Sequence, residues 1–297
     1  MIYTVTLNPA IDHFVSLPTF AAGGLSRAET EEFSFGGKGV NVSRVLKELG
    51  VPSVALGFIA GFTGEMLEKG VKQNAITTDF VRVAGATRVN TKIAASGEET
   101  ELNGVGPTVS EADFSNLLCK VKTLDTEDVL VLSGSLAKGL SVNAYARLAA
   151  AAKDGVRVVV DTAGEPLKEA LAAKPFLIKP NEAELRALCS DEGGDPLTLA
   201  KRAQEMGARN VLLSRGAAGA LLLTEGGDVF ECAAPQGTVQ STVGAGDSLL
   251  AGFLAARDSG KSPADALRFG VAVGSATAFS VGLAKKEDID AVLAAME

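Results

Sequence analysis

The sequence of 297 residues predicts an α/β fold, in which a doubly wound, mainly parallel β-sheet carries helices on both faces and a small β-sheet forms a lid. Two observations predict the main sheet: short apolar runs alternate with segments of helical period, and glycine clusters fall where helices should begin. A third observation predicts the lid. Residues 12–35 and 86–103 alternate like strands, yet no helix follows them. We expect a single domain over residues 1–297.

The main elements are expected in a regular order along the chain. Residues 1–8 alternate like a first strand, and the apolar residues of 42–49 have the spacing of a helix that ends at Gly50. Further strands are expected at residues 53–58, 128–132, 156–161, 175–179, 209–214 and 218–224. Further helices are expected at residues 114–121, where Ser110 and Asp113 can form a capping box, at 142–152, and over a helical stretch at 245–296.

The composition excludes several classes of function. Acidic residues outnumber basic ones 36 to 28, which gives a net charge of -8 and argues against nucleic acid or an anionic membrane as a partner. One histidine and three cysteines cannot supply a metal cluster of the usual spacing. The start of the chain lacks the pattern of a signal peptide, and scattered cysteines are typical of reduced thiols, so we expect a cytoplasmic protein.

A first glycine cluster, Gly36–Asn41 (GGKGVN), precedes the helix expected at 42–49. Glycines at a helix start let a ligand approach the backbone, where unpaired N–H groups favour polar or anionic partners. Asn41 could then hydrogen-bond hydroxyl groups. A glycine-rich turn that only begins a helix is the alternative, and the spacing alone does not choose between them.

A second cluster, Ser241–Ser248 (STVGAGDS), precedes an apolar helix. The N–H groups of Gly244, Ala245 and Gly246 would lie at the positive end of that helix, where they could stabilise the charge of a phosphoryl group in transfer. Asp247 beside them could accept the proton of an attacking hydroxyl. The alternative is an acidic residue that only complements the helix dipole. The triplet GKS at residues 260–262 lacks the first glycine of a P-loop, so we interpret it as a helix end.

Four motifs in order resemble those of the ribokinase-like, or phosphofructokinase B, family of sugar kinases. Both glycine clusters resemble the signatures of that family, and between them lie an N-x-x-E motif and a nucleotide loop, at residues 181–184 and 214–219. The resemblance covers essentially the whole chain, including Asn8–Asp12 (NPAID). Ser241 stands where the second signature often begins with Asp, which leaves a monovalent-cation site open.

The resemblance implies a role for each motif, with ATP and Mg²⁺ as cofactors. Asp247 would be the catalytic base, and the N–H groups of residues 244–246 the anion hole. Asn181 and Glu184 would hold Mg²⁺ through water, unless they only begin a helix. The residues expected to contact ATP are Lys179, Asn181, Ser214, Gly216, Ala217, Ala218, Gly219, Ala220 and Val243. The residues expected to hold the sugar are Asp12, Gly37, Asn41 and Ser135.

Cationic residues near the lid point to an acceptor that already carries phosphate, because a buried phosphate needs charged donors to replace its lost hydration. The residues expected to meet this acceptor are Arg27, Lys38, Arg88, Asn90 and Lys92, of which the last three share one face of a strand. A solvated lid face is the alternative. The motifs resemble most the 1-phosphofructokinase and tagatose-6-phosphate kinase members of the family.

That resemblance implies fructose 1-phosphate as the first choice of acceptor. The alternatives are tagatose 6-phosphate and fructose 6-phosphate, the last disfavoured because Leu25 replaces a lysine of the 6-phosphofructokinase pattern. A sugar-phosphate sensor without catalysis is the alternative from another class, and the intact Asp247 argues against it. The resemblance also implies a homodimer that forms through the lid.

Overall fold

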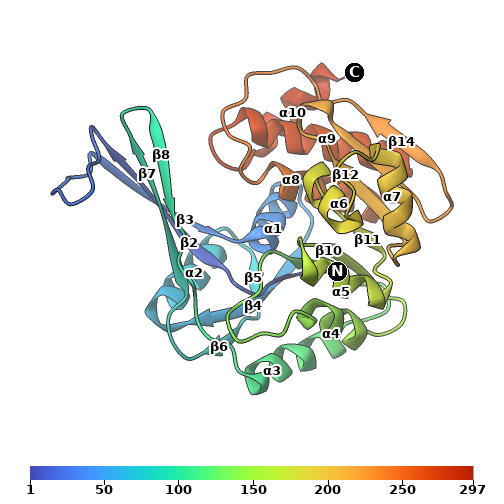
Figure 1. Cartoon of the computed structure of the whole chain (residues 1–297), viewed down its shortest axis with the longest axis horizontal. Coiled ribbons are helices and arrows are strands. Elements are labelled where there is room, and N and C mark those ends of the chain that lie inside the picture. The colour runs from blue at the N-terminus through green and yellow to red at the C-terminus, as the bar shows by residue number, and fades with distance from the viewer. Residues whose placement is uncertain (297) are drawn as a thin grey trace.

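The structure, a computed structural model that describes residues 1–296, confirms the predicted α/β fold (Figure 1). Its main sheet has ten strands, nine of them in the order β14-β13-β12-β11-β10-β9-β1-β4-β5, and β6 pairs with β4. In chain order these strands are β1 (Ile2–Thr6), β4 (Ser53–Ala60), β5 (Thr77–Thr78), β6 (Val81–Val83), β9 (Val129–Ser133), β10 (Arg157–Asp161), β11 (Leu177–Ile178), β12 (Asn210–Ser214), β13 (Ala220–Leu223) and β14 (Val229–Cys232).

Helices cover both faces of this sheet, because successive side chains of the central strands point to opposite faces and both sets are apolar. Against one face pack α3 (Glu111–Lys122), α4 (Ala144–Ala151), α5 (Glu165–Ala170), α6 (Glu182–Cys189) and α7 (Pro196–Glu205). Against the other face pack α1 (Lys38–Glu48), α2 (Gly61–Gln73), α8 (Ala245–Asp258), α9 (Pro263–Phe279) and α10 (Lys286–Ala295). The predicted capping box of Ser110 and Asp113 begins α3.

The structure adds detail to two expectations for the C-terminal part. Strand β13 runs antiparallel to β12, because only the short 3-10 helix Gly216–Ala218 joins them and a parallel crossover needs a longer connection. The stretch expected as helical at 245–296 is three helices, in which Gly260 follows the end of α8 and Ser262 caps α9. The GKS triplet is therefore a turn between two helices, as expected.

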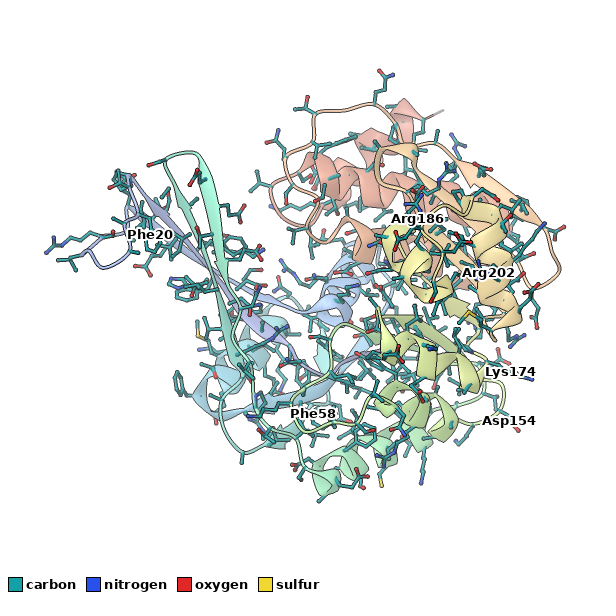
Figure 2. All side chains as sticks on the ribbon, in the orientation of Figure 1. Phe20, Phe58, Asp154, Lys174, Arg186 and Arg202 are labelled. Carbon is teal, nitrogen blue, oxygen red and sulfur yellow. The ribbon has the colours of Figure 1, made fainter. Side chains whose placement is uncertain are left out.

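The lid is a separate four-stranded sheet in the order β3-β2-β7-β8, formed by β2 (Ala10–Leu17), β3 (Thr30–Gly36), β7 (Arg88–Ala95) and β8 (Glu98–Leu102). It projects from the edge of the main body (Figure 1). Its two chain segments lie close to the predicted 12–35 and 86–103. The loop of residues 18–29 lies at the outer end of the lid, where Figure 2 labels the exposed Phe20.

Candidate active site

The start of α8 carries the proposed base. Gly244 caps this helix with φ 80°, and a Cβ there would lie 2.5 Å from Leu283 Cδ2, so only glycine fits this turn. The turn places the N–H groups of residues 244–246 at the positive end of a 14-residue helix. Asp247 lies in the first helical turn and is 6% exposed. A carboxylate so deeply buried at a helix start needs explicit partners.

The first partner of Asp247 comes from the other glycine cluster. Asn41 Nδ2 donates to Asp247 Oδ2 at 2.8 Å, although 206 residues separate the two. Helix α1 can approach β1 closely enough for this contact because Gly37, with φ 124°, would place a Cβ only 2.6 Å from Thr6 Cγ2. Residues of both glycine clusters thus meet at one place, so the GGKGVN segment does more than begin a helix.

Two lysines meet beside the base on a carboxylate that the motifs did not identify. Lys38 Nζ and Lys179 Nζ lie 3.1 Å and 3.3 Å from Asp161 Oδ1. Asp161 ends β10 and is fully buried, and its Oδ2 has no hydrogen-bond partner among residues 1–296. The signal in the sequence was an acidic residue that ends an apolar strand, VRVVVD, at the edge where parallel sheets bind ligands.

These charges determine the protonation of the base. Burial raises the pKa of Asp247 to about 7, and the negative charge of Asp161 adds to the rise. The Asn41 hydrogen bond and the two lysines act in the opposite direction on this pKa. Burial works to lower the pKa of Lys38, but attraction to Asp161 and Asp247 outweighs it and the pKa is raised. The lysine stays a cation, while the carboxyl can exchange a proton near neutral pH.

A cavity of about 1110 Å³ extends from Asp247 along the ends of β11 and β12. Its expected lining residues are Lys38, Asn41, Lys179, Asn181, Glu184, Ser214, Gly216, Ala217, Gly219, Val243, Gly244, Ala245, Gly246 and Asp247. The same cavity is also lined by apolar residues, among them Pro235, Val239, Val271, Ala278 and Phe279. A cavity of this size with both charged and apolar lining residues suits a nucleotide.

Local hydrogen bonds hold the N-x-x-E motif and the nucleotide loop in place at this cavity. Asn181 and Ser214 form a β-bridge that joins the ends of β11 and β12. Asn181 and Glu184 form a capping box, in which each side chain accepts from the backbone N–H of the other at 2.8 and 2.9 Å. The helix-start role that was the alternative for these residues is therefore present, and it also holds both side chains at the cavity.

Two of the residues expected to meet the acceptor, Arg88 and Asn90, lie where the lid meets the end of β1. Asn90 Nδ2 donates to Asp12 Oδ1 at 3.0 Å, since β2 and β7 pair with Asp12 opposite Asn90. Arg88 Nε donates to the carbonyl of Asn8 at 3.1 Å. A Cβ at Gly36 would lie 2.7 Å from Asp12 Oδ2 and 3.8 Å from Asn41 Oδ1, so the lid carboxylate lies close to the partner of the base.

Several residues expected in the site do not line this cavity. Lys92 shares the face of Arg88 and Asn90, but its ammonium pairs with Glu101 at 3.1 Å and lies over the Phe14 ring. Arg27 lies in the exposed loop at the outer end of the lid. Ser135 is exposed in the loop after β9, and Ala218 is exposed in the short 3-10 helix. Ala220 is buried in β13, because its place in the sheet faces the core.

The comparison with protein families decides the class. Residues 5–289 match the family model described as pfkB family carbohydrate kinase. The chain belongs to this family of carbohydrate kinases. The geometry agrees with that membership, because the four motifs on which the resemblance rested converge on one cavity and the base.

Members of the pfkB family with known names are similar over nearly the whole chain. A 1-phosphofructokinase of Bacillus subtilis is 43% identical, covering 99% of this chain and 97% of that protein. A D-tagatose-1-phosphate kinase of Bacillus licheniformis is 38% identical, with 98% and 96% covered. The structure of phosphofructokinase-2 from Escherichia coli in complex with fructose-6-phosphate matches with a TM-score of 0.91 at 32% identity, covering 99% of this chain and 98% of that chain.

Proposed function

We propose that this pfkB kinase transfers the γ-phosphoryl group of ATP to a hydroxyl of a ketohexose phosphate, with fructose 1-phosphate as the acceptor. The observation that carries the proposal is the buried Asp247 at the start of α8, hydrogen-bonded to Asn41 and next to two lysines. Such a group can accept a proton next to backbone donors aimed at a phosphoryl group. The 1-phosphofructokinase relative supports the choice of acceptor.

The residues divide the reaction between them. Asp247 would take the proton of the attacking hydroxyl, and a pKa near 7 makes it both ionised and basic enough at neutral pH. The N–H groups of residues 244–246 would stabilise charge on the transferred group. Lys179 lies against this turn, since a Cβ on Gly246 would be 3.2 Å from its Nζ. Asp161 holds the ammonium groups of Lys179 and Lys38 near Asp247.

The donor atoms around the cavity fit Mg²⁺. Asn181 and Glu184, which line the cavity, and the neighbouring Asp161 offer oxygen, and the buried Asp161 Oδ2 has no hydrogen-bond partner among residues 1–296. Oxygen donors with a few water molecules and substrate phosphates are the usual surroundings of this ion. Asn181 and Glu184 would hold it through water, and Mg²⁺ would neutralise charge on the ATP phosphates.

The magnesium assignment predicts a change in metal dependence. Glu184→Gln should raise the Mg²⁺ concentration for half-maximal rate by roughly 10- to 100-fold, because an outer carboxylate typically contributes that much to metal affinity or activity. Initial rates measured across a Mg²⁺ series at fixed ATP give this value. If the dependence of the rate on Mg²⁺ concentration is unchanged, Glu184 only caps α6 and does not help to hold the metal.

The acceptor is tested by an ADP-release assay on fructose 1-phosphate, tagatose 1-phosphate, tagatose 6-phosphate, fructose 6-phosphate and ribose. We expect the highest kcat/KM with fructose 1-phosphate. The second candidate is tagatose 1-phosphate, favoured by the name of the Bacillus licheniformis relative. Best activity with ribose would contradict a phosphorylated acceptor, and no ADP release with any sugar would favour a sensor.

We also propose that the chain is one kinase domain whose lid pairs with a second copy in a cytoplasmic homodimer. Phe14, Phe33 and Leu102 are exposed on the lid, and apolar side chains of this size on a small sheet favour a partner surface. A related structure is described as the tetrameric inhibited form of its own protein, so the mass in solution must be measured. Among residues 1–296, no helix has the length and apolar character needed to cross a membrane.

A further inference from the structure

The segment that follows β8 contacts Asn90, one of the residues expected to meet the acceptor, and Asn8. The N–H of Gly104 donates to Asn90 Oδ1 at 3.2 Å, while Asn90 Nδ2 donates to Asp12 Oδ1. The Asn90 amide is therefore held at both ends, and its orientation toward Asp12 is fixed. Gly104 approaches so closely that a Cβ there would lie 2.7 Å from the carbonyl of Val89 and 3.0 Å from Arg88 Cβ.

Asn8 joins the same segment to the arginine. Its Nδ2 donates to the carbonyl of Val105 at 3.3 Å, and its own carbonyl accepts from Arg88 Nε. Asn8 is 7% exposed, and its Oδ1 lies where Gly106 leaves room, since a Cβ on Gly106 would be 2.3 Å away. Asn8 thus holds the lid connection through its side chain and the guanidinium through its backbone carbonyl.

These contacts bring together three parts of the chain that the motifs treat separately. Asn8 follows β1, Arg88 and Asn90 belong to β7, and Gly104 follows β8. Neither Asn8 nor Gly104 lines the cavity. Their effect on a ligand would pass through the side chains of Arg88 and Asn90, since pre-set donors bind without first losing rotamer freedom.

We propose that Asn8 and Gly104 are positioning residues for acceptor binding, acting through Arg88 and Asn90 respectively. The inference rests on the proposed function, in which Arg88 meets the phosphate of the sugar. Nε is already used by the Asn8 carbonyl, so the terminal nitrogens of Arg88 are the ones left to meet a phosphate oxygen. The site thus depends on two residues that do not touch the sugar.

The test compares Asn8→Ala and Gly104→Ala with matched controls. Asn74→Ala removes another side-chain bond to a backbone carbonyl, at the end of α2, and Gly193→Ala adds a Cβ where no atom lies within 4 Å. Asn8→Ala removes the side-chain bond to Val105 that fixes the residue whose backbone carbonyl holds Arg88. Gly104→Ala adds a Cβ that collides with the Val89 carbonyl and pushes the Gly104 N–H away from Asn90. Each change should raise the KM for fructose 1-phosphate roughly tenfold, the effect of one lost hydrogen bond. We expect the KM for ATP and kcat to change less than about twofold, and both controls to match the wild type.

A double-mutant cycle separates positioning from general destabilisation. In an Arg88→Met background, Asn8→Ala should change the KM for fructose 1-phosphate less than about twofold, because the group it positions is gone. If Arg88→Met raises this KM but neither test variant does, the positioning proposal is overturned and the proposed function stands. Equal rises in both KM values, with a lower Tm, would also overturn it. If Arg88→Met affects no sugar phosphate, the proposed acceptor site itself fails.

Discussion

The two halves of the site are built in different ways. The base and the backbone donors come from one octet, Ser241–Ser248, at the start of α8. Asp12 and Asn90, by contrast, meet only because β2 pairs with β7, and Arg88 is held by the carbonyl of Asn8. The proposed catalytic half is also deeply buried, with Asp247 at 6% and Asp161 at 0% exposure. In the lid, Asn90 is 8% exposed, but the outer strands β3 and β8 consist largely of exposed residues.

Substitutions in the two halves should therefore differ in what they change and by how much. Charges act most strongly where water is excluded, so changes at the buried half should affect rate and stability most. Partly solvated donors on the lid should mainly affect affinity for the acceptor. The predictions below test this difference, from the largest expected effect to the smallest.

The most severe test of the buried half is Asp247→Asn, which preserves size and removes proton acceptance. We expect kcat to fall by roughly 10²- to 10⁴-fold, with little change in sugar-phosphate affinity. Single-turnover rates and equilibrium binding measure the two quantities separately. A variant that keeps more than about a tenth of the wild-type rate in the chemical step would show that Asp247 is not the base.

Arg88→Met tests the lid half. Loss of one charge-assisted contact to phosphate should lower kcat/KM for fructose 1-phosphate by roughly 10- to 100-fold, while the KM for ATP stays within about twofold. Residual activity on fructose without phosphate should barely change, which provides the internal control. If the ATP affinity falls as much as the acceptor affinity, the two halves are not separable in this way.

Asp161→Asn tests whether the lysine pair depends on the buried carboxylate. The substitution leaves Lys179, itself only 5% exposed, without its counter-charge. The free energy of unfolding should fall by about 3 kcal/mol, as for other buried pairs that lose one partner. Denaturant unfolding measures this, and Lys168→Met, which removes an exposed lysine 3.9 Å from Glu165, is the control expected to change little.

The smallest expected effect is a pH-dependent change in stability that depends on Asp247. The pKa of Asp247 is raised by burial to about 7 in the folded chain, against about 3.9 when unfolded, so its contribution to stability is lost as pH rises through that interval. Asp247→Asn should therefore be more thermostable than the wild type at pH 8, by about 2–6 °C, and the gain should shrink at pH 5. Thermal melts at both pH values decide this. An equal gain at both would mean that the carboxyl does not titrate there.

The sequence motifs predicted most of the residues around Asp247, because their arrangement depends on residues that are close together in the sequence. A helix start defines where residues 244–247 point, and spacing along one helix turn brings Asn181 and Glu184 to one face. The alternation of apolar runs was enough for the main sheet. It was not enough for β13, because the direction of a strand depends on its connection and not on its own residues.

The lid half was predicted less completely, because its contacts depend on which strands pair and not on spacing along one strand. A period of two placed Arg88, Asn90 and Lys92 on one face, and the structure keeps them there. Only the neighbouring strand decided that Lys92 would pair with Glu101 and leave the acceptor side to the other two. Likewise, the sequence showed Arg27 within the lid but not that its loop lies at the outer end.

By itself, the sequence determined the fold class and the family motifs and was enough to propose Asp247 as the base, since these depend on residue type and short-range spacing. Tertiary structure alone decided that Asn41 would bond Asp247 across 206 residues and that Lys38 and Lys179 would share Asp161. It also decided that the carbonyl of Asn8 would accept from Arg88 and that Gly104 would donate to Asn90. Contacts between distant segments depend on how strands pair and helices pack, and no local pattern encodes that arrangement.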